Sequence, residues 1–159
     1  MSRRGKIKAR QSVSLTVEAH PMVTKLVNKV MVSGKKEIAR RLIKNAFARI
    51  GKETKADPVE IYLQVLERVK PRVEVRSRQV GGAAYQVPAL VRGKRQESLA
   101  LRWIIASARQ RSSKEYHTFA DKLAAEILDA HKGVGGAISK REEVEKIAEA
   151  NRAFAHLRW

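Results

Sequence analysis

Hydrophobic side chains recur at intervals of three and four residues along most of the chain, which is the spacing of one face of an α-helix. Asp57, Pro58 and Glu60 add a helix-start signal, because an aspartate can cap a helix and a proline suits its first turn. We expect that helix to end before Pro71. The same spacing predicts four further helices, over residues 22–33, 35–50, 97–111 and 116–130.

The last part of the chain predicts one more helix, after a flexible break. The stretch KGVGG over residues 132–136 interrupts the helical spacing, and Ser139 with Glu142 forms a second capping signal. The helix that follows mixes four basic with four acidic side chains. We interpret them as ion pairs on a solvent-exposed helix.

Between residues 73 and 91 the helical spacing of hydrophobic residues is replaced by an alternation of apolar and polar side chains, which is typical of a β-strand. In VEVRSRQ the two valines occupy one face, and Glu74, Arg76 and Arg78 occupy the other. A Gly-Gly pair permits a turn, and a proline in the return strand excludes a central position in a sheet. A lone two-stranded hairpin is only marginally stable in water. We therefore expect it to be braced by the helices at its base or by a partner at its tip.

These patterns predict a mainly α protein: a bundle of about six helices with one protruding β-hairpin and a basic N-terminal arm. We expect the arm over residues 1–17 and a single helical domain over residues 18–159, with the β-ribbon at 73–91. The length of 159 residues suits one domain with a substantial core. Aromatic residues make up only 5% of the chain, so the core must be mostly aliphatic.

The large net positive charge of the chain indicates a negatively charged partner. The chain has 34 Lys and Arg against 16 Asp and Glu, a net charge of +18. A polyanion would neutralise this excess; nucleic acid is the first candidate and an anionic membrane surface the second. A merely basic protein without such a partner is the plainer alternative. The sequence contains neither an apolar run of about 20 residues nor a signal-peptide core, so we expect no membrane association and interpret the arm as mature sequence.

Catalytic and metal-binding patterns are missing from the sequence. The chain has no cysteine, and its four histidines lack the spacing of a metal site. It contains no nucleophile elbow, phosphate-binding loop or dinucleotide fingerprint. We therefore expect no enzyme activity, metal, cofactor or small-molecule substrate.

Basic residues gather in the arm, in residues 35–55, and on the hairpin with its exit. Arginine forks on one strand face suit phosphate groups. Tyr85 either stacks on a base or packs at the hairpin base, and the sequence does not separate the two. For Trp103 a place in the core is the better interpretation.

Several long stretches resemble one known family. They are LVNKVMVSGKK (26–36), VEVRSRQVGGAAYQVP (73–88), LALRW (99–103), LAAEILDA (123–130) and AEANRAFAHLRW (148–159). In this order they resemble ribosomal protein seven of the small subunit, in its bacterial or organellar form, over essentially the whole chain. That family has a bundle of about six helices and a protruding β-ribbon.

The resemblance implies a structural, RNA-binding function in the ribosome, either cytoplasmic or organellar. The family binds the 3′ major domain of small-subunit ribosomal RNA (rRNA) directly and starts assembly of the subunit head. It lies at the subunit interface near the exit-site transfer RNA (tRNA) and the messenger RNA channel. Small-subunit proteins nine and eleven are its neighbours.

The resemblance implies roles for the residues of this sequence that match the family's motifs. The implied rRNA contacts are Arg3, Arg4, Lys6, Lys8 and Arg10 of the arm, Lys35 and Lys36, Arg76 and Arg78, and Arg92, Lys94, Arg95 and Arg102. The implied hairpin tip next to tRNA comprises Gly81, Gly82 and Tyr85. The implied contacts with protein eleven or RNA at the C-terminus are Arg152, His156, Arg158 and Trp159.

The chain departs from the family pattern in four places. Gln79 replaces a third ribbon base, so one phosphate contact is lost or softened. The segment 112–122 is about three residues longer, Glu145 stands where a histidine is common, and the usual Asp-Pro start is missing from 17–21.

The alternative function, from another class, is a free-standing basic helical protein that binds or compacts DNA, which would need a recognition helix.

Overall fold

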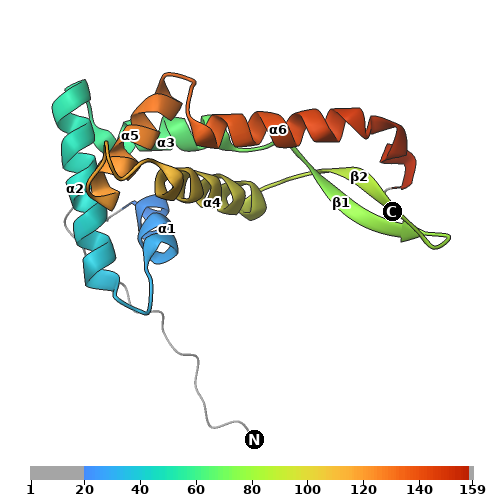
Figure 1. Cartoon of the computed structure of the whole chain (residues 1–159), viewed down its shortest axis with the longest axis horizontal. Helices are drawn as coiled ribbons and strands as arrows, with labels where there is room; N and C mark the ends of the chain where they lie inside the picture. The colour runs from blue at the N-terminus through green and yellow to red at the C-terminus, as the bar shows by residue number, and fades with distance from the viewer. Residues whose placement is uncertain (1–19, 158–159) are drawn as a thin grey trace, which may run out of the picture.

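The computed structural model describes residues 20–157, so the predicted arm over 1–17 lies outside the described residues, as do Arg158 and Trp159. Within the described residues there are six α-helices, one 3₁₀ helix and one antiparallel pair of strands (Figure 1). The predicted mainly α fold with one hairpin is confirmed. In chain order the elements are α1 (Pro21–Val30), α2 (Lys36–Thr54), α3 (Pro58–Val69), β1 (Val73–Val80), β2 (Ala83–Leu90), α4 (Lys94–Gln110), α5 (Phe119–His131), α6 (Gly136–Ala150) and the 3₁₀ helix η2 (Arg152–Leu157).

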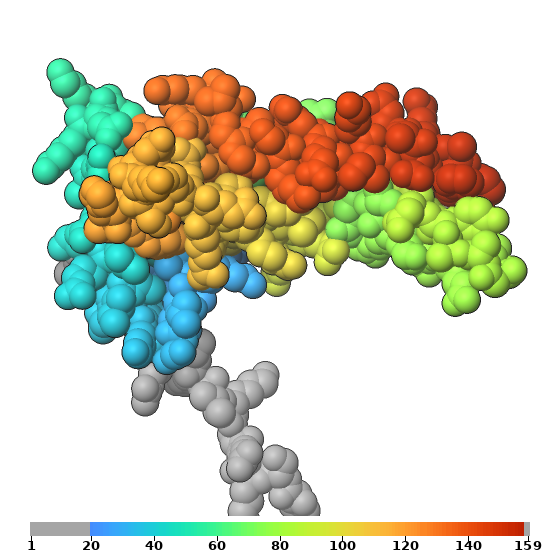
Figure 2. Space-filling view, in the orientation of Figure 1, coloured from blue at the N-terminus to red at the C-terminus, as the bar shows by residue number. Residues whose placement is uncertain are grey.

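Five helices form one end of the molecule, and the hairpin extends from it beside α6 (Figure 1). The helical core is mostly aliphatic, with the rings of Phe47 and Tyr62 packed at 5.6 Å between centroids. Trp103 packs against this core while remaining partly exposed, as the sequence favoured. In space-filling view the outline is concave between α1 and the hairpin, and the start of α4 lies between them (Figure 2). The projecting hairpin therefore forms one side of a concave surface.

Local capping explains where two helices begin. His20 caps α1, where its Nδ1 atom accepts a hydrogen bond from the Met22 amide at 3.2 Å. Asp57 caps α3 as predicted and accepts from the Val59 amide at 3.0 Å. In both helices a proline occupies the first turn.

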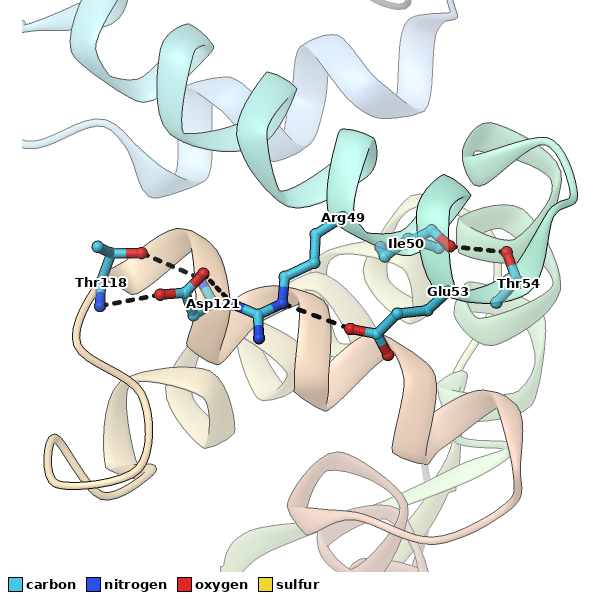
Figure 3. Close-up of polar contacts among 6 residues, drawn as sticks. All are labelled: Arg49, Ile50, Glu53, Thr54, Thr118 and Asp121. Carbon is cyan, nitrogen blue, oxygen red and sulfur yellow. Dashed lines mark hydrogen bonds and ion pairs between the residues drawn. The ribbon is translucent and has the colours of Figure 1, made fainter.

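The start of α5 is fixed by a capping box and by an ion pair to a neighbouring helix (Figure 3). The Thr118 hydroxyl accepts from the Asp121 amide at 3.2 Å, and the Asp121 carboxylate accepts from the Thr118 amide at 3.3 Å. Asp121 also accepts from Arg49 of α2, which pairs in turn with Glu53. The sequence-based start at residue 116 was therefore slightly early.

Three other predicted boundaries were wrong. α1 ends at Val30, short of the predicted residue 33. α2 continues through Gly51 to Thr54, and its C-cap residue Lys55 has a φ of 55°, in the left-handed region. α4 begins at Lys94 rather than residue 97. The error at the end of α2 arose because Gly51 punctuates the sequence without ending the helix.

The second predicted capping signal was also wrong. α6 begins at Gly136, and Ser139 lies inside its first turn, where its hydroxyl donates to the Gly135 carbonyl at 3.2 Å. The cap comes instead from the preceding helix, because the Glu126 carboxylate accepts the Ala137 amide at 2.9 Å. The mixed charges on α6 do form ion pairs, including Lys140 with Glu143.

Candidate nucleic-acid interface

The hairpin turn consists of two glycines in left-handed backbone conformations. Gly81 has φ of +58° and Gly82 has φ of +87°, and the strands on either side pair from Val80–Ala83 to Val73–Leu90. Positive φ at both central residues is the requirement of a two-residue type I′ turn. No atom lies within 4 Å of a Cβ placed at either glycine, so a side chain would have room there. Glycine is required at these positions because of the positive φ angles.

Arg76 and Arg78 lie on one face of β1 and are exposed, as the alternation predicted. Their cross-strand partners are Val87 and Tyr85. The side chain of Arg76 is 49% exposed even though its Nε atom donates to Glu74 at 2.6 Å. A guanidinium has five N–H donors, so this bond leaves donors for a phosphate.

Glu74, the one acid in the ribbon, organises the base of the basic surface. It is only 7% exposed and accepts from two nitrogens of Arg95, Nε at 2.8 Å and Nη2 at 2.6 Å. Burial raises the pKa of Glu74, but the hydrogen bonds from Arg95 and Arg76 outweigh burial and hold the pKa below its ordinary value. The ionised carboxylate therefore fixes the direction of two guanidinium groups and neutralises only one of their charges. Sequence reasoning placed Glu74 on this face without giving it a role.

The exit of the hairpin and the start of α2 carry the other predicted cations. Arg92, Lys94 and Arg95 are exposed around the α4 cap residue Gly93, whose φ is 53°. Lys35 is exposed and Lys36 half-buried, directly after a turn in which Ser33 and Gly34 have φ of 51° and 72°. Arg102 is exposed on α4, with one weak contact to the Ser98 hydroxyl at 3.5 Å.

The start of α4 and the exposed side of α1 enclose a groove that sequence reasoning missed. It is lined by Lys25 and Lys29 of α1 and by Lys94 of α4. The signal was present in the sequence, because Lys25 and Lys29 are four residues apart and avoid the buried stripe of α1. These lysines add to the basic character of the concave side between α1 and the hairpin.

Tyr85 contacts the C-terminal segment. Its ring lies 5.3 Å, centroid to centroid, from the ring of Phe154 in η2, at an interplanar angle of 51°. This geometry favours packing, the second of the two interpretations left open for Tyr85, although its partner is η2 and not the helices at the hairpin base. Arg152 is exposed in η2, and His156 is exposed with Nδ1 at 2.9 Å from the Ala153 carbonyl oxygen.

Metal clusters and membrane-spanning helices are absent from residues 20–157. These residues contain no cluster of three or more potential metal ligands among His, Asp and Glu. None of their helices combines the length and apolar character needed to cross a membrane.

A comparison with protein families decides the class of this protein. A family model described as "Ribosomal protein S7p/S5e" matches residues 2–152. The chain belongs to this ribosomal protein family. Members of the family are structural proteins of the small ribosomal subunit and not enzymes, and they work within the ribosome.

Individual relatives agree over the full length. The chain is 48% identical to "Small ribosomal subunit protein uS7" of Carboxydothermus hydrogenoformans over 159 residues, 100% of both chains. It is 47% identical to the protein of the same name from Moorella thermoacetica and 48% identical to that from Mycobacterium avium, again over 100% of each chain. The resemblance found in the sequence motifs is therefore confirmed.

Proposed function

We propose that this uS7-family protein binds the 3′ major domain of small-subunit rRNA directly and starts assembly of the subunit head. One observation carries the proposal: a buried Glu74 holds Arg95 and Arg76 in place beside the exposed Arg78, on a hairpin that projects from the helices. Guanidinium groups held in this way are suited to paired phosphate oxygens.

The rest of the basic surface supports the same partner. Lys35, Lys36, Arg92, Lys94 and Arg102 are exposed or half-buried and contribute to a net charge of +18 over the chain. Phosphate neutralisation with release of counterions would supply most of the affinity. The arm residues Arg3, Arg4, Lys6, Lys8 and Arg10 would extend the contact along the RNA.

The hairpin tip and the C-terminus have further proposed partners. The Gly81–Gly82 turn would approach the exit-site tRNA near the messenger RNA channel. Arg152, His156 and the two final residues, Arg158 and Trp159, would meet protein eleven or RNA, with protein nine as a further neighbour. The contact between Tyr85 and Phe154 supports a common placement, because it joins the tip-proximal strand to the C-terminal segment.

A competition assay tests the central part of this proposal. Full-length protein is mixed with a labelled 3′ major-domain fragment, and unlabelled fragment, unrelated structured RNA of equal length and duplex DNA compete at several salt concentrations. We expect the ribosomal fragment to compete several-fold better than the other two. Equal competition by all three would leave only a generic basic protein, and a preference for duplex DNA would support the DNA-binding alternative.

A further inference from the structure

The groove between α1 and α4 combines cations with a carboxylate and an amide. Its volume is ≈ 530 Å³, within the range of about 300–1,000 Å³ typical of small-ligand pockets. The lysines at its edge are suited to phosphate, whereas the carboxylate would repel phosphate and suits a hydrogen-bond donor. The lining includes Lys25, Asn28 and Lys29 of α1 and Lys94, Glu97 and Leu101 of α4.

Glu97 is held ionised at the side of this groove. The Lys25 Nζ atom lies 2.5 Å from Glu97 Oε2 and so links α1 to α4. The hydrogen bond from Lys25 holds the pKa of Glu97 below its ordinary value. The described residues supply no hydrogen-bond donor to the second oxygen, Oε1, and the side chain is 26% exposed. A carboxylate has about four lone-pair sites, so a ligand in the groove meets Oε1 and also a second site on Oε2 beside Lys25.

A carboxylate selects among the bases by the donors on their Watson–Crick edges. An ionised carboxylate only accepts hydrogen bonds. Guanine presents two adjacent donors, N1–H and N2–H, whereas adenine and cytosine present one amino group beside an acceptor and uracil presents one imino group between two carbonyls. Unpaired bases in RNA are commonly recognised on these edges.

We propose that this groove takes one unpaired guanine nucleotide of the bound RNA, with Glu97 accepting from its Watson–Crick edge. Lys29 and Lys94 contact the flanking phosphates, and Leu101, which is 2% exposed, adds an apolar side chain to the lining. The inference rests on the proposed rRNA binding and adds a base-specific contact to it. Glu97 is thus a specificity-determining residue, while the lysines contribute affinity without reading sequence.

A selection experiment with full-length protein tests this assignment. The probe is a pool of 3′ major-domain fragments in which the unpaired positions are randomised, and bound RNA is sequenced for wild type, Glu97→Gln, Lys29→Ala and the control Glu60→Gln. Glu60 is also a first-turn acid, in α3, and has no place in the groove. Thermal unfolding of each variant verifies that it is folded.

We expect wild type and Glu60→Gln to enrich guanine at one unpaired position and Glu97→Gln to lose that preference at that position alone. Affinity of Glu97→Gln for the guanine-bearing RNA should fall about 5- to 150-fold, the usual value of a bidentate base contact. Lys29→Ala should weaken binding to all sequences alike. Unchanged guanine enrichment by folded Glu97→Gln would overturn the inference and leave rRNA binding intact. Failure of wild type to prefer the fragment over unrelated RNA would instead overturn the proposed function, and this inference with it.

Discussion

The Glu74 carboxylate at the start of β1 accepts hydrogen bonds from both Nε and Nη2 of Arg95 in the first turn of α4. This bidentate pair joins the hairpin to the helical part of the chain across 21 residues of sequence. It also holds in a fixed direction an arginine that we propose binds RNA. The Glu74–Arg95 ion pair thus braces the base of the hairpin and also positions a cation there.

Replacing Glu74 by Gln should destabilise the protein at neutral pH. The folded state holds the pKa of Glu74 below its ordinary value, so this contribution to stability is present above the unfolded pKa and is lost as pH falls through the folded pKa. The difference in free energy of unfolding between wild type and Glu74→Gln should be constant near pH 6–7 and shrink below about pH 4. Urea unfolding at several pH values measures it. A difference that persists undiminished at low pH would contradict the role of the ion pairs.

Glu126 should be the costliest carboxylate to remove from the described part of the chain. It is 1% exposed, accepts from Arg111 Nε at 2.8 Å and caps α6 through the Ala137 amide. Glu126→Ala leaves the buried Ala137 amide without its acceptor, while Arg111 keeps its other partner, Asp129. The substitution should cost about 1–3 kcal/mol of unfolding free energy. The control Glu143→Ala removes an exposed ion pair with Lys140 and should cost less than about 1 kcal/mol. Similar losses in urea unfolding for the two variants would refute this view of Glu126.

Thr118→Ala should lower stability without changing RNA affinity. The substitution removes the hydroxyl that accepts from the Asp121 amide, a cap worth about 0.5–2 kcal/mol (Figure 3). Calorimetry measures the fall in melting temperature, and Thr118→Ser, which keeps the hydroxyl, serves as the control. A loss of RNA affinity at a temperature where the variant is fully folded would show that this corner also binds RNA.

The contact between Tyr85 and Phe154 should set the stability of the hairpin. Tyr85→Ala and Phe154→Ala should each speed hydrogen exchange of the hairpin amides, and a double-mutant cycle should give a coupling of about 0.5–1.5 kcal/mol. Tyr85→Phe keeps the ring and should behave like wild type. If Tyr85→Ala leaves hydrogen exchange unchanged but weakens RNA binding, base stacking is the correct role of Tyr85.

The fold was predictable where the determinants are local in sequence. Asp57 caps an amide only two residues away, so its signal predicted the start of α3 correctly. Ser139 resembled the same signal, but α6 is capped by Glu126, 11 residues away on α5, and no local pattern reveals that contact. α2 was predicted to end at residue 50, but it runs through Gly51 to Thr54.

In the candidate site, too, features set by local sequence were predictable and features set by tertiary contacts were not. Strand alternation placed Arg76 and Arg78 together on one face, which requires only the period of a strand. The role of Glu74 depends on Arg95, and the groove depends on α1 lying beside α4, so both required the tertiary structure. All the proposed contacts with RNA stay predictions, and those of the arm and the final residues also lie outside the described part of the chain.

The most direct test of the central claim is the salt dependence of binding to the 3′ major-domain fragment. Wild type is compared with Arg76→Ala/Arg78→Ala and with the control Lys140→Ala/Lys146→Ala, which removes the same charge from the charge-mixed helix α6. We predict that the arginine variant binds more weakly, with a slope of log affinity against log salt about 1–2 units shallower, and that the lysine variant matches wild type. Equal slopes and affinities for wild type and the arginine variant would contradict the claim that the hairpin binds rRNA.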